Sequence, residues 1–143
     1  MAAYRKSARA LTALAALALT AGPALAAKTS WDVKLSGANE TPAGDPAASG
    51  TAKVSIDDAT NELCYDVATT GLNATMAHIH KGAKGAAGGV AVPLDTPKDG
   101  ATKACKTIDP ALAKAILADP AGYYVNVHSD KFPAGAIRAQ LRG

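Results

Sequence analysis

The sequence predicts an all-β protein, an antiparallel sandwich or barrel with one short helix. Short segments with alternating apolar and polar residues recur along the chain, which is typical of half-buried strands. Glycine, proline, asparagine and aspartate are concentrated between these segments, where turns are expected. One segment, 110–118, instead has helix formers throughout and follows Asp109, a residue type that caps helix N-termini.

Most of the expected strands have one clear apolar face. They span residues 28–35, 51–56, 62–68, 76–80, 90–94, 101–108, 123–128 and 136–141. The turn residues at 57–61 predict a hairpin between the second and third strands. Pro93 predicts an edge position for its strand, because proline has no N–H to donate to a neighbour. In the last strand Ile137 faces inward and Arg138 faces outward, where we expect a solvated charge or a salt-bridge partner.

Residues 1–26 are predicted to be a cleaved signal peptide, which leaves a single domain at 27–143. Three basic residues precede the apolar run 11–21, and Ala-Leu-Ala at 24–26 has the form of a cleavage site. The apolar run is short for a membrane span, so an uncleaved anchor is the less favoured alternative. We therefore expect a periplasmic or secreted protein with no membrane span after cleavage.

Charge and aromatic content argue against a nucleic-acid partner. The chain has 15 basic and 12 acidic residues, but three of the basic residues lie in the predicted leader, so the domain has no formal net charge. Trp31 and Phe132 are the single Trp and the single Phe, too few for a surface on which bases stack.

The two cysteines, Cys64 and Cys105, are expected to form a disulfide, because an exported protein meets an oxidising compartment. In the chain-entropy model, closing a loop of about 40 residues stabilises a fold by about 3–4 kcal/mol. The alternative is that one or both thiolates bind a metal ion. Their distance in sequence from the histidines neither supports nor excludes that alternative.

All three histidines of the chain lie in predicted strands and form a candidate metal site. His78 and His80 are two residues apart, so a strand directs both imidazoles to one face, about 6–7 Å apart at the backbone. His128, at the end of the strand 123–128, would complete a three-nitrogen site if its strand lies nearby. The competing interpretation is three polar strand residues that hydrogen-bond to loops.

Further side chains are candidates for the same site. Met76 has the parity of the histidines, and its thioether is a soft ligand that suits Cu(I), so copper is preferred and zinc is the alternative. Asp66, Asp130 and Glu62 are alternative oxygen ligands. Asn126 or Asp130 is expected to hold an imidazole by a hydrogen bond from outside the ligand set.

The glycine-rich segment 81–89 and Ser129 bear less directly on function. The segment is interpreted first as a plain connector and second as a loop whose backbone approaches a ligand near the histidines. It lacks the Gly-Lys-Ser/Thr sequence of a phosphate-binding loop. Ser129 follows His128 directly and would point to the other face of a continuing strand, so no serine–histidine nucleophile is expected.

Several motifs in order resemble the CHRD domain, the repeat named after chordin. They are Leu-Ser-Gly-Ala-Asn-Glu-Thr-Pro at 35–42, Ala-His-Ile-His-Lys-Gly at 77–82, Tyr-Val-Asn-Val-His-Ser at 124–129 and Phe-Pro-Ala-Gly-Ala-Ile-Arg-Ala-Gln-Leu at 132–141. The resemblance covers essentially all of the chain after the leader and is to the single-domain, exported bacterial members of the family. Met76 departs from it, because a small residue is expected there.

The resemblance implies a Greek-key β-sandwich or barrel of immunoglobulin-like or superoxide-dismutase-like form. It implies little about activity, although in chordin the domain belongs to an extracellular regulator of growth factors. The histidine motifs map onto His78, His80 and His128. A weaker likeness is to copper-zinc superoxide dismutase, but three histidines are too few for that enzyme's full ligand set, so dismutase activity is not expected.

These patterns lead to a functional hypothesis with two alternatives. The first is an exported copper-binding protein that captures or buffers the ion through a three-histidine site. The second is a metal-free extracellular interaction or structural module that binds a protein or the cell envelope. The least favoured is a copper redox enzyme, since the sequence shows no substrate cleft.

Overall fold

The computed structural model describes residues 27–142, so the predicted signal peptide lies outside the described residues. The described chain is mostly antiparallel strand with one α-helix. Its strands are β1 (Lys28–Ser36), β2 (Ser49–Asp57), β3 (Glu62–Thr70), β4 (Ala74–Lys81), β5 (Gly89–Leu94), β6 (Ala101–Thr107), β7 (Tyr123–Ser129) and β8 (Ile137–Gln140). The helices are α1 (Pro110–Ala118) and the 3-10 turns η1 (Gly37–Asn39) and η2 (Pro120–Gly122). Every predicted strand is present, with ends shifted by at most three residues.

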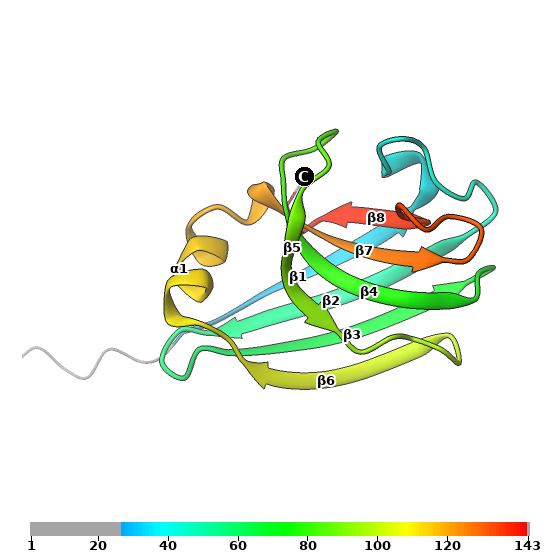
Figure 1. Cartoon of the computed structure of the whole chain (residues 1–143). Coiled ribbons are helices and arrows are strands. Elements are labelled where there is room, and N and C mark those ends of the chain that lie inside the picture. The colour runs from blue at the N-terminus through cyan, green and yellow to red at the C-terminus, as the bar shows by residue number, and fades with distance from the viewer. Residues whose placement is uncertain (1–26, 143) are drawn as a thin grey trace, which may run out of the picture.

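All strands belong to one sheet, in the order β5-β4-β7-β8-β1-β2-β3-β6. Figure 1 shows that this sheet curls into a half-barrel, with its two edge strands turned toward each other. The edges β5 and β6 are linked by a side chain, because Lys106 Nζ donates to the Pro93 carbonyl over 2.6 Å. Pro93 thus lies in an edge strand, as its missing N–H predicts.

The hydrophobic core lies against one face of the sheet. In strands such as β3 and β8 its members alternate with residues that face away from the core, as a half-buried sheet requires. Ile79, Val125 and Val127 are fully buried in it. Helix α1 lies beside one end of the sheet (Figure 1) and adds Ala113 and Ile116 to the core.

The start of α1 follows its capping chemistry. The Asp109 side chain accepts hydrogen bonds from the backbone N–H groups of Ala111 and Leu112, and Pro110 occupies the first turn.

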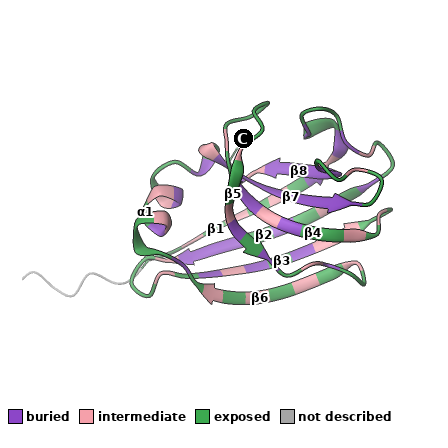
Figure 2. Ribbon diagram, viewed as in Figure 1, coloured by how far each residue is buried: buried purple, intermediate pink, exposed green. Residues whose placement is uncertain are grey.

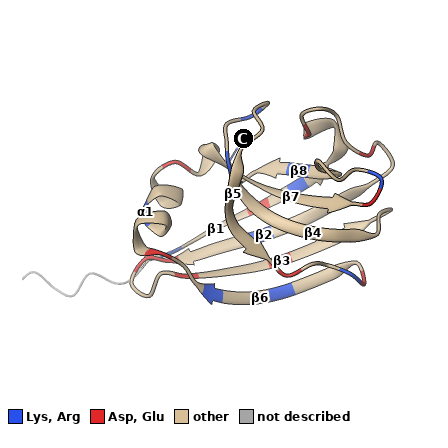
Figure 3. Ribbon diagram, viewed as in Figure 1, with Lys and Arg blue, Asp and Glu red and all other residues tan. Residues whose placement is uncertain are grey.

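Burial differs between the inner strand β7 and the edge strand β6. Every residue of β7 is buried, whereas β6 alternates between exposed and half-buried residues (Figure 2). The lysines of β6 are visible along that edge strand in Figure 3. Because β7 is buried on both faces, its polar residues are covered by something other than the hydrophobic core, and these polar residues include Asn126 and His128.

Candidate metal centre

The three histidines leave the sheet on the face opposite to the hydrophobic core, which we call the outer face. In the register of β4 and β7, His78 lies opposite Asn126, and Met76 lies opposite His128. Directly opposed residues of antiparallel strands project to the same face. The alternate residues Ile79, Val125 and Val127 fill the core, so the histidines must project outward.

The structure brings the three imidazoles together. His78 Nδ1 and His128 Nε2 are 3.1 Å apart. The ring centroid of His80 lies 5.3 Å from that of His78 and 5.9 Å from that of His128. One nitrogen of each ring lies within 4.8 Å of the other two, which is compatible with a single ion between them.

Two backbone carbonyls determine which nitrogens are free. His80 Nδ1 is 2.9 Å from the Gly88 carbonyl, and His128 Nδ1 is 3.0 Å from the Pro133 carbonyl. A carbonyl oxygen only accepts, so both Nδ1 atoms carry hydrogen and both Nε2 atoms have a lone pair. A metal-ligating histidine is commonly held by a bond of this kind from its other nitrogen.

His78 completes the set through Nδ1. Since His128 Nε2 has a lone pair, His78 Nδ1 donates its hydrogen to that atom as the rings stand. His80 Nε2 is buried and has no hydrogen-bond partner. The candidate donor set is therefore Nδ1 of His78 and Nε2 of His80 and His128.

The surroundings keep two of these imidazoles neutral. Burial lowers the pKa of His78 below its usual value, and repulsion by His128 and His80 adds to the effect. Burial also lowers the pKa of His80, although its bond to the Gly88 carbonyl partly opposes this. A lowered pKa leaves the lone pair available at neutral pH, as metal binding requires.

The glycine-rich loop 82–88 contacts one of the histidines, His80, through its backbone, which favours the second of the two interpretations of this segment. Besides the Gly88 carbonyl on His80, the Gly88 N–H donates to the Tyr124 hydroxyl over 3.0 Å. A Cβ atom on Gly88 would lie 1.7 Å from the Lys81 carbonyl oxygen, so only glycine fits there. The loop is thus held next to His80 by backbone hydrogen bonds on one side of the candidate site.

Arg138 is not the solvated outer charge that strand alternation predicts. It does project to the outer face, but its exposed fraction is only 2%. Its guanidinium donates to the carbonyls of Ala83 and Ala86, each over 2.8 Å, and to Gln140 Oε1. The loop 82–88 covers this part of the outer face, so a residue that faces away from the core is still buried.

Arg138 also connects the loop to the histidines through an aromatic ring. Its Cζ lies 3.4 Å from the centroid of the Tyr124 ring, a cation–π contact. The His80 ring is parallel to Tyr124, with centroids 4.9 Å apart and planes at 5°. Tyr124 is on β7, which lies between β4 and β8 in the sheet, so it bridges Arg138 and His80.

Glu40 is a buried acidic residue that the sequence interpretation left without a role. It lies just after η1, is 8% exposed, and accepts a hydrogen bond from Asn126 Nδ2. Burial raises the pKa of Glu40 to about 7, while the charge of Arg138 and the bond from Asn126 lower it. Gly135 packs so closely that an added Cβ would lie 2.7 Å from both side chains. In the sequence, Glu40 could have been noticed as an acidic residue inside a glycine- and proline-rich loop.

Of the other predicted ligands, Met76 lies near the histidines, whereas Asp66 and Glu62 lie elsewhere on the sheet. Met76 lies opposite His128 on the outer face and is 45% exposed. Asp66 pairs with Lys103 over 3.4 Å at the far end of the sheet, and Glu62 lies beside Cys64 and Cys105. Within residues 27–142, no acidic residue joins the histidine cluster.

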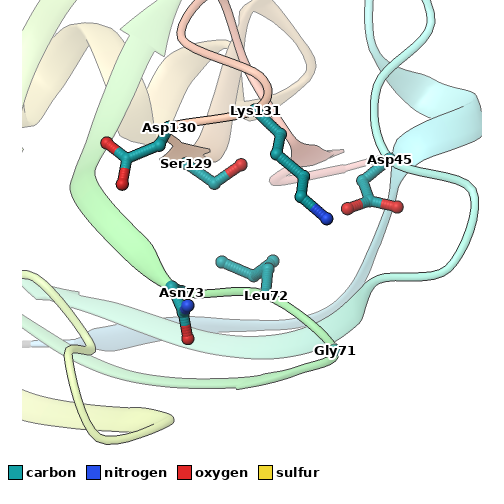
Figure 4. Close-up of a pocket in the computed structure, with 7 residues that line it drawn as sticks. All are labelled: Asp45, Gly71, Leu72, Asn73, Ser129, Asp130 and Lys131. Carbon is teal, nitrogen blue, oxygen red and sulfur yellow. The ribbon is translucent and has the colours of Figure 1, made fainter.

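Among the described residues, neither Asn126 nor Asp130, the two residues predicted to hold an imidazole, forms a hydrogen bond to a histidine. Asn126 binds Glu40 rather than a histidine, and Asp130 is exposed and lines a surface pocket. That pocket, of ≈ 440 Å³, lies beside the end of β7 and contains none of the histidines (Figure 4).

Cys64 and Cys105 form a disulfide between directly opposed residues of β3 and β6. Neither sulfur is therefore a free thiolate, and the alternative of thiolate ligands does not hold for the structure. No helix among residues 27–142 is long and apolar enough to cross a membrane.

These features define an antiparallel β protein with a three-histidine cluster on the loop-covered outer face of its sheet. The family model described as the CHRD domain matches residues 31–141. The chain therefore belongs to the CHRD domain family. Neither the curated proteins nor the solved structures that were searched gave a match to it.

Proposed function

We propose that this protein binds one copper ion through His78, His80 and His128 and captures or buffers it. The observation that carries the proposal is the buried Nε2 of His80, which has no hydrogen-bond partner and faces a cluster of imidazole nitrogens. A buried polar atom without a partner costs free energy, and a metal ion would compensate for it. Imidazole nitrogens suit copper, zinc and nickel.

One further feature favours copper. The set of three nitrogens leaves room for a fourth ligand, and Met76 lies opposite His128 with its side chain partly exposed. A thioether is a soft ligand that suits Cu(I). The chain's own residues orient the ligands: the carbonyls of Gly88 and Pro133 fix the rings of His80 and His128.

The proposal extends to location and family form. The leader-like sequence at 1–26 supports an exported, single-domain bacterial protein that acts in the periplasm or outside the cell. The finer fold assignment, a Greek-key sandwich of immunoglobulin-like or superoxide-dismutase-like form, also stays a prediction, since the strands form one continuous curled sheet.

Titration of purified, metal-stripped protein with Cu(I) and Cu(II) tests the proposed function. We expect one ion per chain and loss of that binding in His78→Ala, His80→Ala and His128→Ala variants that remain folded. Binding is expected to weaken below about pH 6, where protons compete for imidazole lone pairs. Met76→Leu is the matched variant, expected to weaken Cu(I) binding more than Cu(II) binding. A wild-type protein that binds no more copper than the histidine variants would contradict the proposal.

A second candidate is a metal-free interaction module. The observation that favours it is the edge strand β5, where Val90 is 54% exposed. This function predicts that replacing the histidines leaves partner binding unchanged, whereas copper handling predicts loss of metal. A copper redox enzyme would, in addition, consume oxygen or peroxide, which a buffer does not.

A further inference from the structure

Three buried side-chain atoms have no hydrogen-bond partner within residues 27–142: His80 Nε2, Asn126 Oδ1 and Thr69 Oγ1. The first is explained if it binds metal. Asn126 Oδ1 is on the same face of the sheet and needs a different explanation, because an oxygen that only accepts hydrogen bonds is a poor partner for a soft metal ion. Thr69 is on β3, away from the histidines.

The orientation of the Asn126 amide is determined by its neighbours. Its Nδ2 donates to Glu40 Oε1, so Oδ1 is turned away from Glu40. Glu40 is buried, and its Oε1 accepts from the Asn126 amide, which fixes which end of that amide faces Glu40. Asn126 is also the residue directly opposite His78 in the register of β4 and β7.

His78 requires an acceptor only when its Nδ1 binds metal. As the rings stand, the His78 hydrogen is on Nδ1 and is donated to His128 Nε2. A metal ion at Nδ1 needs that lone pair, so the hydrogen must then be on Nε2 of the same neutral ring. One proton leaves Nδ1 and one is taken up at Nε2, so the number of protons on His78 does not change. The His78 ring is half-buried, and a hydrogen bond from this N–H to a protein acceptor would hold the ring in place for the metal ion.

We propose that Asn126 Oδ1 is that partner: it accepts the Nε2 hydrogen of His78, directly or through one water molecule, when a metal ion binds Nδ1. Glu40 is the residue that holds the Asn126 amide in the accepting orientation. The inference rests on the proposed function and adds a tautomer change of His78 to it. Asn126 and Glu40 are positioning residues, since they act through His78 and not on the ion.

The test is the tautomeric state of each histidine, measured from long-range proton–nitrogen NMR spectra of ¹⁵N-labelled protein with and without one equivalent of Cu(I), a diamagnetic probe. We expect His78 to carry its hydrogen on Nδ1 without Cu(I) and on Nε2 with it, while His80 and His128 keep theirs on Nδ1. The wild-type spectra alone decide this point, so a variant that does not fold would not prevent the test.

Substitution identifies the acceptor. In Asn126→Ala, Cu(I) is expected to bind about 10–100-fold more weakly, and the His78 Nε2 hydrogen is expected to exchange rapidly with solvent. Thr69→Val is the matched control, because it removes another unpartnered buried oxygen without touching the site, and it should leave both readouts unchanged. Thermal unfolding of both variants separates loss of fold from loss of positioning.

Two results would overturn the inference while leaving copper binding intact. One is a Cu(I)-loaded wild-type protein in which His78 keeps its hydrogen on Nδ1. The other is an Asn126→Ala variant that binds Cu(I) within threefold of wild type and keeps a protected Nε2 hydrogen. A wild-type protein that binds no Cu(I) would instead overturn the proposed function together with the inference.

Discussion

Replacing Arg138 with methionine is expected to lower the free energy of unfolding by about 3–5 kcal/mol, the range for breaking a buried charged interaction. The substitution removes the side-chain donors to the carbonyls of Ala83 and Ala86, and the Ala83 oxygen keeps only the backbone N–H of Ala86. It also leaves the Glu40 carboxylate without the nearby positive charge that favours its ionised form. The loop 82–88 would lose two of its side-chain attachments, while its bonds to Tyr124 and Gln140 remain.

Urea unfolding followed by circular dichroism measures this effect. Arg138→Lys should be intermediate, because one ammonium group cannot reproduce the planar fork that reaches two carbonyls. Lys103→Met is the matched control: Lys103 pairs with Asp66, but its side chain is 79% exposed. We expect that control to change the free energy by no more than about 0.5 kcal/mol. An Arg138→Met protein as stable as the control would show that the buried guanidinium is not a structural centre.

Removing the disulfide is expected to destabilise the fold by about 3–4 kcal/mol and to leave copper binding unchanged. The bond joins residues 41 apart in sequence, a loop length for which chain entropy predicts that cost. It also attaches β6, an edge strand that pairs only with β3. The histidines lie on β4 and β7 and form a group separate from the cysteines, so the two features should be independent.

The measurement compares Cys64→Ala/Cys105→Ala with wild type in urea unfolding and in copper titration. The variant should unfold at lower urea concentration but bind one ion with the same affinity when folded. Loss of copper binding in a folded double variant would mean that sulfur from these cysteines participates in the site, contrary to the histidine assignment.

Local patterning was enough to predict the strands and the helix. Ile79, Val125 and Val127 are buried at alternate positions, and this alternation predicts the side to which each histidine points. Asp109 and Pro110 locate the start of α1 because capping depends on nearby backbone groups. These features need no knowledge of which strand pairs with which.

The position of His128 relative to His78 could not be predicted in the same way. It depends on the pairing of β4 with β7, which are separated in sequence by β5, β6 and α1. For Arg138, alternation predicted the correct face but not the burial, since the pattern distinguishes core from outer face and does not reveal that a loop covers the outer face. Glu40 was missed for a related reason: its burial depends on Gly135 and Asn126, far away in sequence.

The most direct test of the central claim, that three histidines share one copper ion, is X-ray absorption spectroscopy of the protein loaded with one equivalent of Cu(I). We expect three nitrogen neighbours with the multiple-scattering pattern of imidazole, and a sulfur neighbour that disappears in Met76→Leu. A copper ion with fewer than three imidazole neighbours, or one unchanged by His80→Ala, would contradict the claim.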